Sequence, residues 1–161
     1  MLATDSPSDL IQVLEALYDL EQPRDGWFRG VLKASGTAFD RGAGVGFLLY
    51  DVSGELPRIH ALEGVNVSMH HFAVGAETHR EPAFAKEIVR CYRSVVCATM
   101  AEHVHDPQVL GALRERYTQS GIHDQILING ADVSGQGCAL YVFSQTLLTL
   151  SAYERELERI S

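Results

Sequence analysis

Cysteine is scarce in this chain, and its placement excludes several classes of small protein. Three cysteines occur among 161 residues, at Cys91, Cys97 and Cys138, and no two of them form a C-x-x-C pair. An odd number of cysteines without a signal peptide argues against a disulfide framework. The missing C-x-x-C pair argues against a zinc knuckle or a thioredoxin-like redox centre.

Long apolar runs and a secretory leader are also missing. No uninterrupted apolar stretch approaches the roughly 18 to 20 residues that span a bilayer. The first nine residues contain two aspartates and neither lysine nor arginine, so the basic region of a signal peptide is absent. We therefore expect a cytoplasmic protein with no membrane partner.

Basic charge is sparse as well. The formal net charge is −8, and the densest basic segment is the alternation Arg114-Glu115-Arg116. Because nucleic-acid affinity depends on lysine and arginine replacing phosphate counterions, we do not expect this chain to contact DNA directly. Walker A, G-x-S-x-G and H-E-x-x-H motifs are absent too.

What the sequence does contain is the pattern of one mixed domain. At 46% hydrophobic and 21% charged residues the chain is typical of a single globular unit. Residues 64–81 show no sustained period and are interpreted as a long connection that contains at most one short helical turn. Apolar periodicity and turn signals predict helices over 8–20, 25–36, 82–92 and 106–121, strands over 45–52, 58–62, 95–97, 125–129 and 138–143, and a last helix from Ser151.

This order predicts an α+β fold with one largely antiparallel sheet and helices on both faces. The strand over 45–52 carries the strongest signal. Phe47 points to one side and Tyr50 to the other, and apolar neighbours accompany both. A strand that is apolar on both faces belongs in the middle of a sheet that is covered on both sides.

The last predicted helix opens with a capping box, Ser151-Ala-Tyr-Glu154, and shows no stop signal before Ser161. It is either a helix that forms a dimer or the start of a linker to a further domain. The terminal helices are expected to lie together on one face.

The candidate ligand site is the segment Met69-His70-His71-Phe72, because it falls in the long connection where a lid over a cavity is expected. The other side chains predicted to line such a cavity are Phe47, Tyr50, Met100 and His103. The seven histidines lack a converging pattern of three or four ligands, so no metal site and no cofactor are predicted. The cysteines sit among apolar neighbours, which favours core packing over a catalytic thiol.

Several strings resemble a known family. They are the strand Gly44-Val-Gly-Phe-Leu-Leu-Tyr-Asp51, the passage Gly121-Ile-His-Asp124, the hairpin Asp132-Val-Ser-Gly-Gln-Gly-Cys138 and the helix opened by Ser151. Together with the element order, they resemble the GAF-like N-terminal sensor domain of bacterial LuxR-type transcription regulators. The resemblance spans most of the chain and implies a central antiparallel sheet of about five or six strands with a ligand pocket on one face.

The resemblance further implies a function. Such domains sense a small molecule, form homodimers and relay a signal to a C-terminal helix-turn-helix, so residues 1–161 would be one non-enzymatic sensor domain from a longer chain. DNA would be bound only through that further domain. Two alternatives stay open: a dimerisation module without a ligand, and a GAF-fold reductase of free methionine sulfoxide. The cysteines here, six and then 41 residues apart, do not match that reductase's closely spaced pattern.

Overall fold

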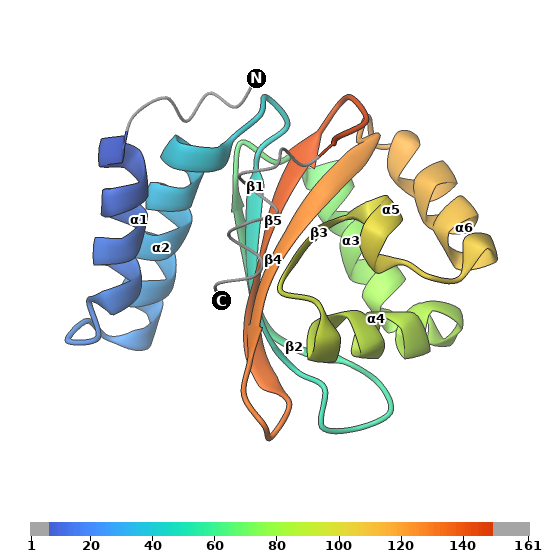
Figure 1. Ribbon diagram of the computed structural model, residues 1–161, viewed down its shortest axis with the longest axis horizontal. Helices are drawn as coiled ribbons and strands as arrows, with labels where there is room; N and C mark the ends of the chain where they lie inside the picture. The colour runs from blue at the N-terminus through green and yellow to red at the C-terminus, as the bar shows by residue number, and fades with distance from the viewer. Residues whose placement is uncertain (1–6, 150–161) are drawn as a thin grey trace.

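The computed structural model describes residues 7–149 and shows three layers, with a sheet between two sets of helices (Figure 1). The five strands are β1 (Val45–Asp51), β2 (Arg58–Val65), β3 (Cys97–Thr99), β4 (Asp124–Ala131) and β5 (Gln136–Ser144). Their order across the sheet is β2-β1-β5-β4-β3, and every neighbouring pair is antiparallel. The expected α+β class and the antiparallel sheet are confirmed.

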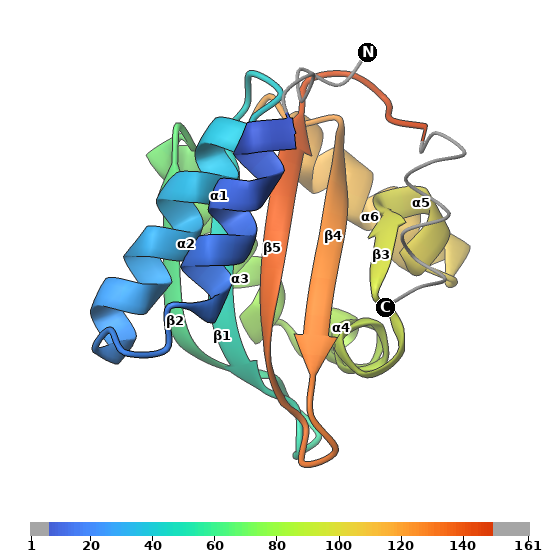
Figure 2. The ribbon, with the colours of Figure 1, turned by 60° about the vertical axis from the view of Figure 1, so that its left-hand side comes forward.

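Two helices, α1 (Pro7–Tyr18) and α2 (Arg24–Phe39), cover one face of the sheet (Figure 2). Helix α2 lies against the strands, and α1 packs on α2. The layer is held by stacked aromatic rings, with Phe28 and Phe47 centroids 4.8 Å apart. Trp27 also donates a hydrogen bond from Nε1 to the Leu17 carbonyl, which ties the two helices together.

The other face carries α3 (Met69–Arg80), α4 (Pro82–Ser94), the short α5 (Met100–His103) and α6 (Pro107–Thr118). Asp106 caps α6 by accepting hydrogen bonds from the Gln108 and Val109 amides, as the Asp-Pro signal predicts. Gly121 follows with a φ of +82°, the left-handed conformation that ends such a helix.

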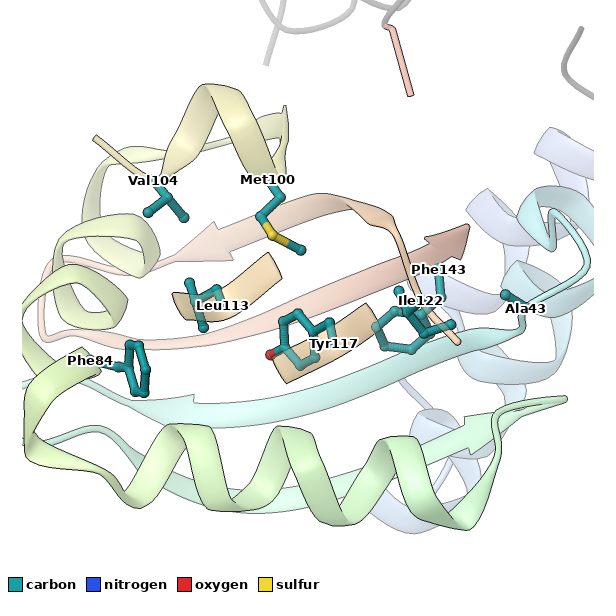
Figure 3. Close-up of a cluster of buried hydrophobic side chains, with 8 residues drawn as sticks. All are labelled: Ala43, Phe84, Met100, Val104, Leu113, Tyr117, Ile122 and Phe143. Atoms are coloured by element: carbon teal, nitrogen blue, oxygen red, sulfur yellow. The ribbon is translucent and has the colours of Figure 1, made fainter. Parts of the chain in front are cut away.

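The alternation along β1 is confirmed. Val45 and Phe47 are buried against α2, whereas Leu48 and Tyr50 are buried on the opposite face. A further apolar cluster joins α4, α5 and α6 to the sheet around Met100, Tyr117 and Phe143 (Figure 3).

One prediction about the chain is wrong. Residues 64–81 are not a long connection: β2 continues to Val65, and Met69–Arg80 form the three-turn helix α3, capped by Ser68. Apart from Phe72, the positions of α3 that face the cavity hold histidine, glycine, alanine and arginine, so the apolar stripe that marks a buried helix is missing from the sequence.

Smaller boundary differences also occur. Helix α2 runs to Phe39 rather than Gly36, α1 ends at Tyr18, and the short strand is Cys97–Thr99 rather than 95–97. The predicted final helix from Ser151 lies outside the described residues.

Candidate functional site

A cavity of about 460 Å³ lies between the sheet and α3. This volume falls in the range of pockets that hold small organic ligands. Strands β1, β2, β4 and β5 form its floor, and α3 and α6 form its roof. Its lining residues are Gly46, Leu48, Pro57, Arg58, Ile59, His60, Ala61, Leu62, His71, Phe72, Gly75, Ala76, His79, Arg80, Tyr117, Gln125, Tyr141 and Phe143.

The walls are mostly apolar, and the charged side chains stand at the outside. Leu48, Leu62 and Phe143 contribute apolar surface from three strands. Arg58 and Arg80 are exposed. The interior is therefore suited to a molecule that is apolar over most of its length.

A chain of hydrogen bonds runs along one wall. Tyr141 Oη lies 2.8 Å from Tyr92 Oη, and Tyr92 Oη lies 2.7 Å from His79 Nε2. His79 Nδ1 lies 2.7 Å from the carbonyl oxygen of Gly75, one turn earlier in α3. Burial lowers the pKa of His79 and raises that of both tyrosines, so all three groups are neutral at pH 7.

His71 projects from the first turn of α3. Its ring packs edge-on against Phe143, with centroids 4.3 Å apart, and its Nδ1 lies 2.9 Å from Ser120 Oγ. Burial lowers the pKa of His71 to about 4, with a smaller contribution from neighbouring His70. The imidazole is therefore neutral under physiological conditions.

Gln125 is the least expected residue of the site. It is only 5% exposed and lines the cavity from β4. Its side-chain amide has no hydrogen-bond partner among residues 7–149. Its amide atoms are not among the fully buried unpaired atoms, so they border the cavity, where water or a ligand can supply the hydrogen bonds.

A second, smaller space of about 30 Å³ continues inward beneath α4 and α6. His79, Tyr117, Gln125 and Tyr141 line both spaces, so they form the boundary between them. His103 borders the inner space, and its Nδ1 is buried with no partner in the described part of the chain.

Some of the residues predicted from the sequence lie at the cavity, and others lie away from it. His71 and Phe72 line the main cavity, and His103 borders the inner one. Tyr50 is buried deeper on the same face, where its ring stacks on Tyr92. Met100 belongs to the apolar cluster around α5 (Figure 3).

The remaining predicted residues lie away from the cavity. Phe47 is buried on the opposite face, under α2. Met69 is 83% exposed, and His70 is exposed beside it. Ligand binding by any of the predicted residues stays a prediction.

Sequence reasoning missed Gln125, Tyr141, Tyr92 and His79. A signal for two of them was present: Gln125 and Tyr141 are polar residues inside otherwise apolar central strands. Such positions normally hold aliphatic side chains, so a polar one indicates an inward-facing function or a buried network.

The cysteines do not form a reactive site. Cys97 and Cys138 lie on strands that β4 separates and are offset by two residues in register, so their backbones are more than about 9.5 Å apart. This exceeds the Cα separation of a disulfide. Cys91 lies on the other face, in α4.

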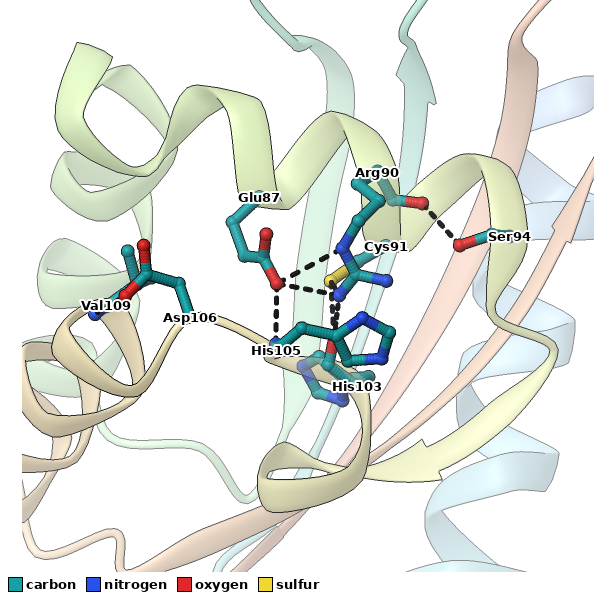
Figure 4. Close-up of polar contacts among 8 residues, drawn as sticks. All are labelled: Glu87, Arg90, Cys91, Ser94, His103, His105, Asp106 and Val109. Atoms are coloured by element: carbon teal, nitrogen blue, oxygen red, sulfur yellow. Dashed lines mark hydrogen bonds and ion pairs between the residues drawn. The ribbon is translucent and has the colours of Figure 1, made fainter.

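Cys91 takes part in contacts that hold the fold together (Figure 4). Its Sγ donates a hydrogen bond to the His103 carbonyl, and Arg90 donates to the same oxygen. Glu87 accepts from Arg90 and from the His105 amide, so α4 holds the segment between α5 and α6 in place. Burial raises the pKa of Cys91 to about 12, which keeps the thiol protonated and unreactive.

No cluster of three or more histidine, cysteine, aspartate or glutamate side chains suited to a metal ion occurs among residues 7–149. Within the same residues, no helix is both long and apolar enough to cross a bilayer.

Comparison with known proteins gives a match in structure but none in sequence. No family model matches the chain, and no curated protein matches it. Among solved structures, it is similar to CepR2 from Burkholderia cenocepacia, described as an N-acylhomoserine lactone dependent LuxR family transcription factor. The TM-score is 0.60 with 14% identity, over 96% of this chain and 88% of the other.

The two chains thus share a fold. At 14% identity the likeness does not establish a shared ligand or a shared function. The fold is that of a LuxR-family structure, in line with the expected resemblance, whereas the GAF-like part of that expectation stays a prediction.

Proposed function

We propose that this chain is the sensor domain of a cytoplasmic transcriptional regulator and that it binds a small, largely apolar molecule between the sheet and α3. The observation that carries the proposal is the cavity of about 460 Å³, whose mostly apolar walls include the Gln125 side chain, which makes no hydrogen bond within residues 7–149. An empty cavity lowers the stability of a folded domain, and cavities of this size are commonly ligand-binding sites. The fold shared with a lactone-dependent transcription factor supports this proposal.

The mechanism we propose is a population shift. A ligand in the cavity contacts α3 and α6 together with four strands, so it favours the arrangement in which these elements close around it. DNA would be bound by a separate domain of a longer chain, because a net charge of −8 disfavours direct contact with phosphates.

The direct test is a binding screen by thermal shift and calorimetry with N-acylhomoserine lactones of several chain lengths and a panel of apolar metabolites. A bound ligand raises the melting temperature in proportion to its affinity and concentration. We expect at least one compound to bind with micromolar or better affinity.

A matched pair of glycine variants locates the binding. Gly75 lines the cavity from α3, and a Cβ at this position meets no atom within 4 Å. Gly75→Leu should therefore fill the hollow and abolish binding while leaving the helix intact. Gly111→Leu is the control: a Cβ there is equally free, but Gly111 lies on α6 outside the cavity. Failure of every compound to bind, or equal binding by both variants, contradicts the proposal.

A dimerisation module is the second candidate, and one observation favours it. Ile11, Leu14 and Tyr18 follow one face of α1 at helical spacing and are 53%, 54% and 79% exposed. Apolar stripes of this kind often mark contacts between subunits.

We propose that a second copy of the chain covers this stripe of α1. The double variant Leu14→Gln/Tyr18→Gln should then convert a dimer to a monomer in sedimentation equilibrium. Exposed Val133 lies on the hairpin between β4 and β5, far along the chain from α1, and Val133→Gln serves as the control. A monomeric wild-type protein contradicts this part of the proposal.

A further inference from the structure

Helices α3 and α4 pack against each other on the same face of the sheet, but they are fastened to the molecule differently (Figure 1). The Tyr92 ring of α4 stacks on Tyr50 of β1, with centroids 4.1 Å apart. The buried side chains of α4 are Phe84, Ala85, Cys91 and Tyr92. Helix α4 is therefore anchored by apolar packing at both of its ends.

Helix α3 lacks such an anchor. Its buried side chains are His71 and Thr78, which are polar and lie near opposite ends of the helix. Between them, Gly75 lines the cavity, and a Cβ at this position meets no atom within 4 Å. Glycine also weakens the interior of a helix relative to alanine, because it gives the unfolded chain more freedom. The middle of α3 is thus weakly held.

The first turn of α3 lies against the strands. Phe72 sits over Gly64 of β2 so closely that a Cβ on Gly64 would overlap the Phe72 ring. The His71 ring packs edge-on against Phe143 of β5, with centroids 4.3 Å apart. Because both contacts are with the sheet, this end of α3 is fixed to it.

An arginine of α6 fastens the other end of α3. Arg116 Nη2 lies 2.7 Å from Glu81 Oε2, between α3 and α4, and Arg116 Nη1 lies 3.4 Å from Thr78 Oγ1 in the last turn of α3. The guanidinium carbon also lies 4.9 Å from the centre of the Phe84 ring in α4. One planar cation therefore joins the last turn of α3 to α4 and α6.

The contacts of this last turn are mostly polar. The side chains of Arg116 and Glu81 are 29% and 41% exposed, so water can replace the bond between them. His79 Nε2 lies 2.7 Å from Tyr92 Oη, which is a second polar contact. Polar groups exchange such bonds for bonds to water when a segment opens, whereas buried apolar side chains lose their packing outright. Opening this part of α3 therefore requires less free energy than opening α4.

The cavity reaches the surface beside the same turn. Arg80 at the end of α3 and Arg58 at the start of β2 both line the cavity, and both are exposed. Strand β2 is also an edge of the sheet formed by the described residues. A displacement of the last turn of α3 would therefore widen an existing approach to the cavity.

We propose, on the basis of the ligand-binding function argued above, that the C-terminal half of α3 is a gate that opens locally while α4 and the sheet stay folded. Gly75 and Glu81 are the two ends of the moving segment, and Arg116 is the latch that holds it closed. A small molecule enters and leaves between α3 and β2 without unfolding of the domain.

Hydrogen exchange followed by mass spectrometry tests the gate without any ligand. In the wild-type chain, the amides of residues 76–80 should exchange at least about tenfold faster than those of residues 88–92 in α4, after correction for intrinsic rates. Low concentrations of urea should hardly change the exchange of residues 76–80, because a local opening exposes little surface. Equal protection of the two segments would overturn the proposal, and this comparison depends on no variant.

Two arginines of α6 test the latch. Arg116→Gln removes the contacts with Glu81 and Thr78 and should speed the exchange of residues 76–80 by at least about threefold. Arg114→Gln removes the same charge from the same helix and is the matched control, which should leave that exchange unchanged. An equal rise in both variants, or a rise that spreads over α4 and the sheet, would mean general destabilisation and would contradict the latch.

Two glycines test the moving segment. Gly75→Ala should slow the exchange of residues 76–80 by about two- to fivefold, because alanine favours the helix and its Cβ meets no atom. Gly111→Ala adds a Cβ at an equally free position on α6 and should have no effect on α3. Unchanged exchange in Gly75→Ala would mean that the opening does not involve this half of α3.

The gate and the sensing function can fail separately. If residues 76–80 exchange as slowly as α4, the gate is overturned, and a compound that binds in the screen still supports the sensing function. If no compound of the screen binds, the sensing function fails, and the exchange rates still decide whether α3 opens locally.

Discussion

The two faces of the sheet use the same strands but bury different kinds of surface. On the face under α1 and α2, Phe28, Val45 and Phe47 are each at most 4% exposed and fill the space between the layers. On the face under α3, a cavity with mostly apolar walls also exposes polar side chains such as His71 and Gln125. We call these the filled face and the hollow face.

The difference shows how one domain can combine stability with a binding site. Close packing on the filled face supplies dispersion and hydrophobic energy that a cavity cannot supply. The hollow face sacrifices part of that energy, and its unpaired polar groups add a further cost. The filled face thus serves as the scaffold on which the hollow face is held.

The largest effect that tests this contrast is expected from Phe47→Ala. Phe47 is 2% exposed and stacks on Phe28, so its loss should lower the free energy of unfolding by about 3–5 kcal/mol. Urea denaturation measures the change. Phe72→Ala on the hollow face is the matched control and should cost about 1–2 kcal/mol, because Phe72 already borders empty space. Equal costs would contradict the contrast.

A pH titration should show a smaller effect that belongs to the hollow face. Burial lowers the pKa of His71 from 6.5 to about 4, so between these values the unfolded chain binds the proton more readily. Stability should therefore fall as the pH drops from 6.5 towards 4 and be unaffected by this group above 6.5. The shift corresponds to ~3 kcal/mol, which water in the cavity should reduce to ~2 kcal/mol.

The variant His71→Gln isolates this contribution, because His79 and His103 also have pKa values lowered by burial and remain in both proteins. The difference between the two stability curves, measured from pH 4 to pH 7.5, should narrow as the pH falls. Parallel curves would show that His71 is not shielded as the structure indicates.

The filled face was the more predictable of the two from the sequence. The strand over Val45–Asp51 is apolar on both sides, which predicts an interior strand, and β1 indeed lies between β2 and β5. On the hollow face, the Asp106-Pro107 signal gives an equally clear start for α6. Both are local patterns that the fold does not override.

The hollow face was hidden for a physical reason. A helix that covers a core shows apolar residues at every third or fourth position, but α3 covers a cavity. Its inward positions hold His71, Gly75 and His79, so the periodic signal is lost and the segment resembles a loop. Tyr141 and Gln125 were missed because their roles depend on pairing between β4 and β5, which is not a local property.

A further prediction concerns two amides on one strand. Gln125 and Asn129 both lie on β4 and face the same side, but the Asn129 side chain is bonded to Tyr50 and to the Tyr92 and Val95 carbonyls. Asn129→Leu should therefore destabilise the domain by about 2–3 kcal/mol, since it takes a donor from the Val95 carbonyl and leaves the Tyr50 hydroxyl and the Tyr92 carbonyl only their 3.1 Å bond to each other. Gln125→Leu should instead stabilise it by about 1 kcal/mol, because it removes an amide that has no partner in the described chain.

Thermal and urea denaturation of the two leucine variants measure these opposite signs. A loss of stability in Gln125→Leu comparable to that in Asn129→Leu would show that the Gln125 amide is satisfied in the free protein. The hollow face would then be an ordinary polar core rather than a site that awaits a ligand.

The smallest effect is expected at the edge of the filled face. Arg29 of α2 and Glu63 of β2 form an ion pair with a 3.5 Å separation, and their side chains are 70% and 44% exposed. Because solvent screens such a pair, Glu63→Gln should change the free energy of unfolding by less than about 0.5 kcal/mol. A loss above 1 kcal/mol in urea denaturation would mean that charge, and not apolar packing, holds α2 on the sheet. That result would remove the physical basis for treating the filled face as the scaffold of the site.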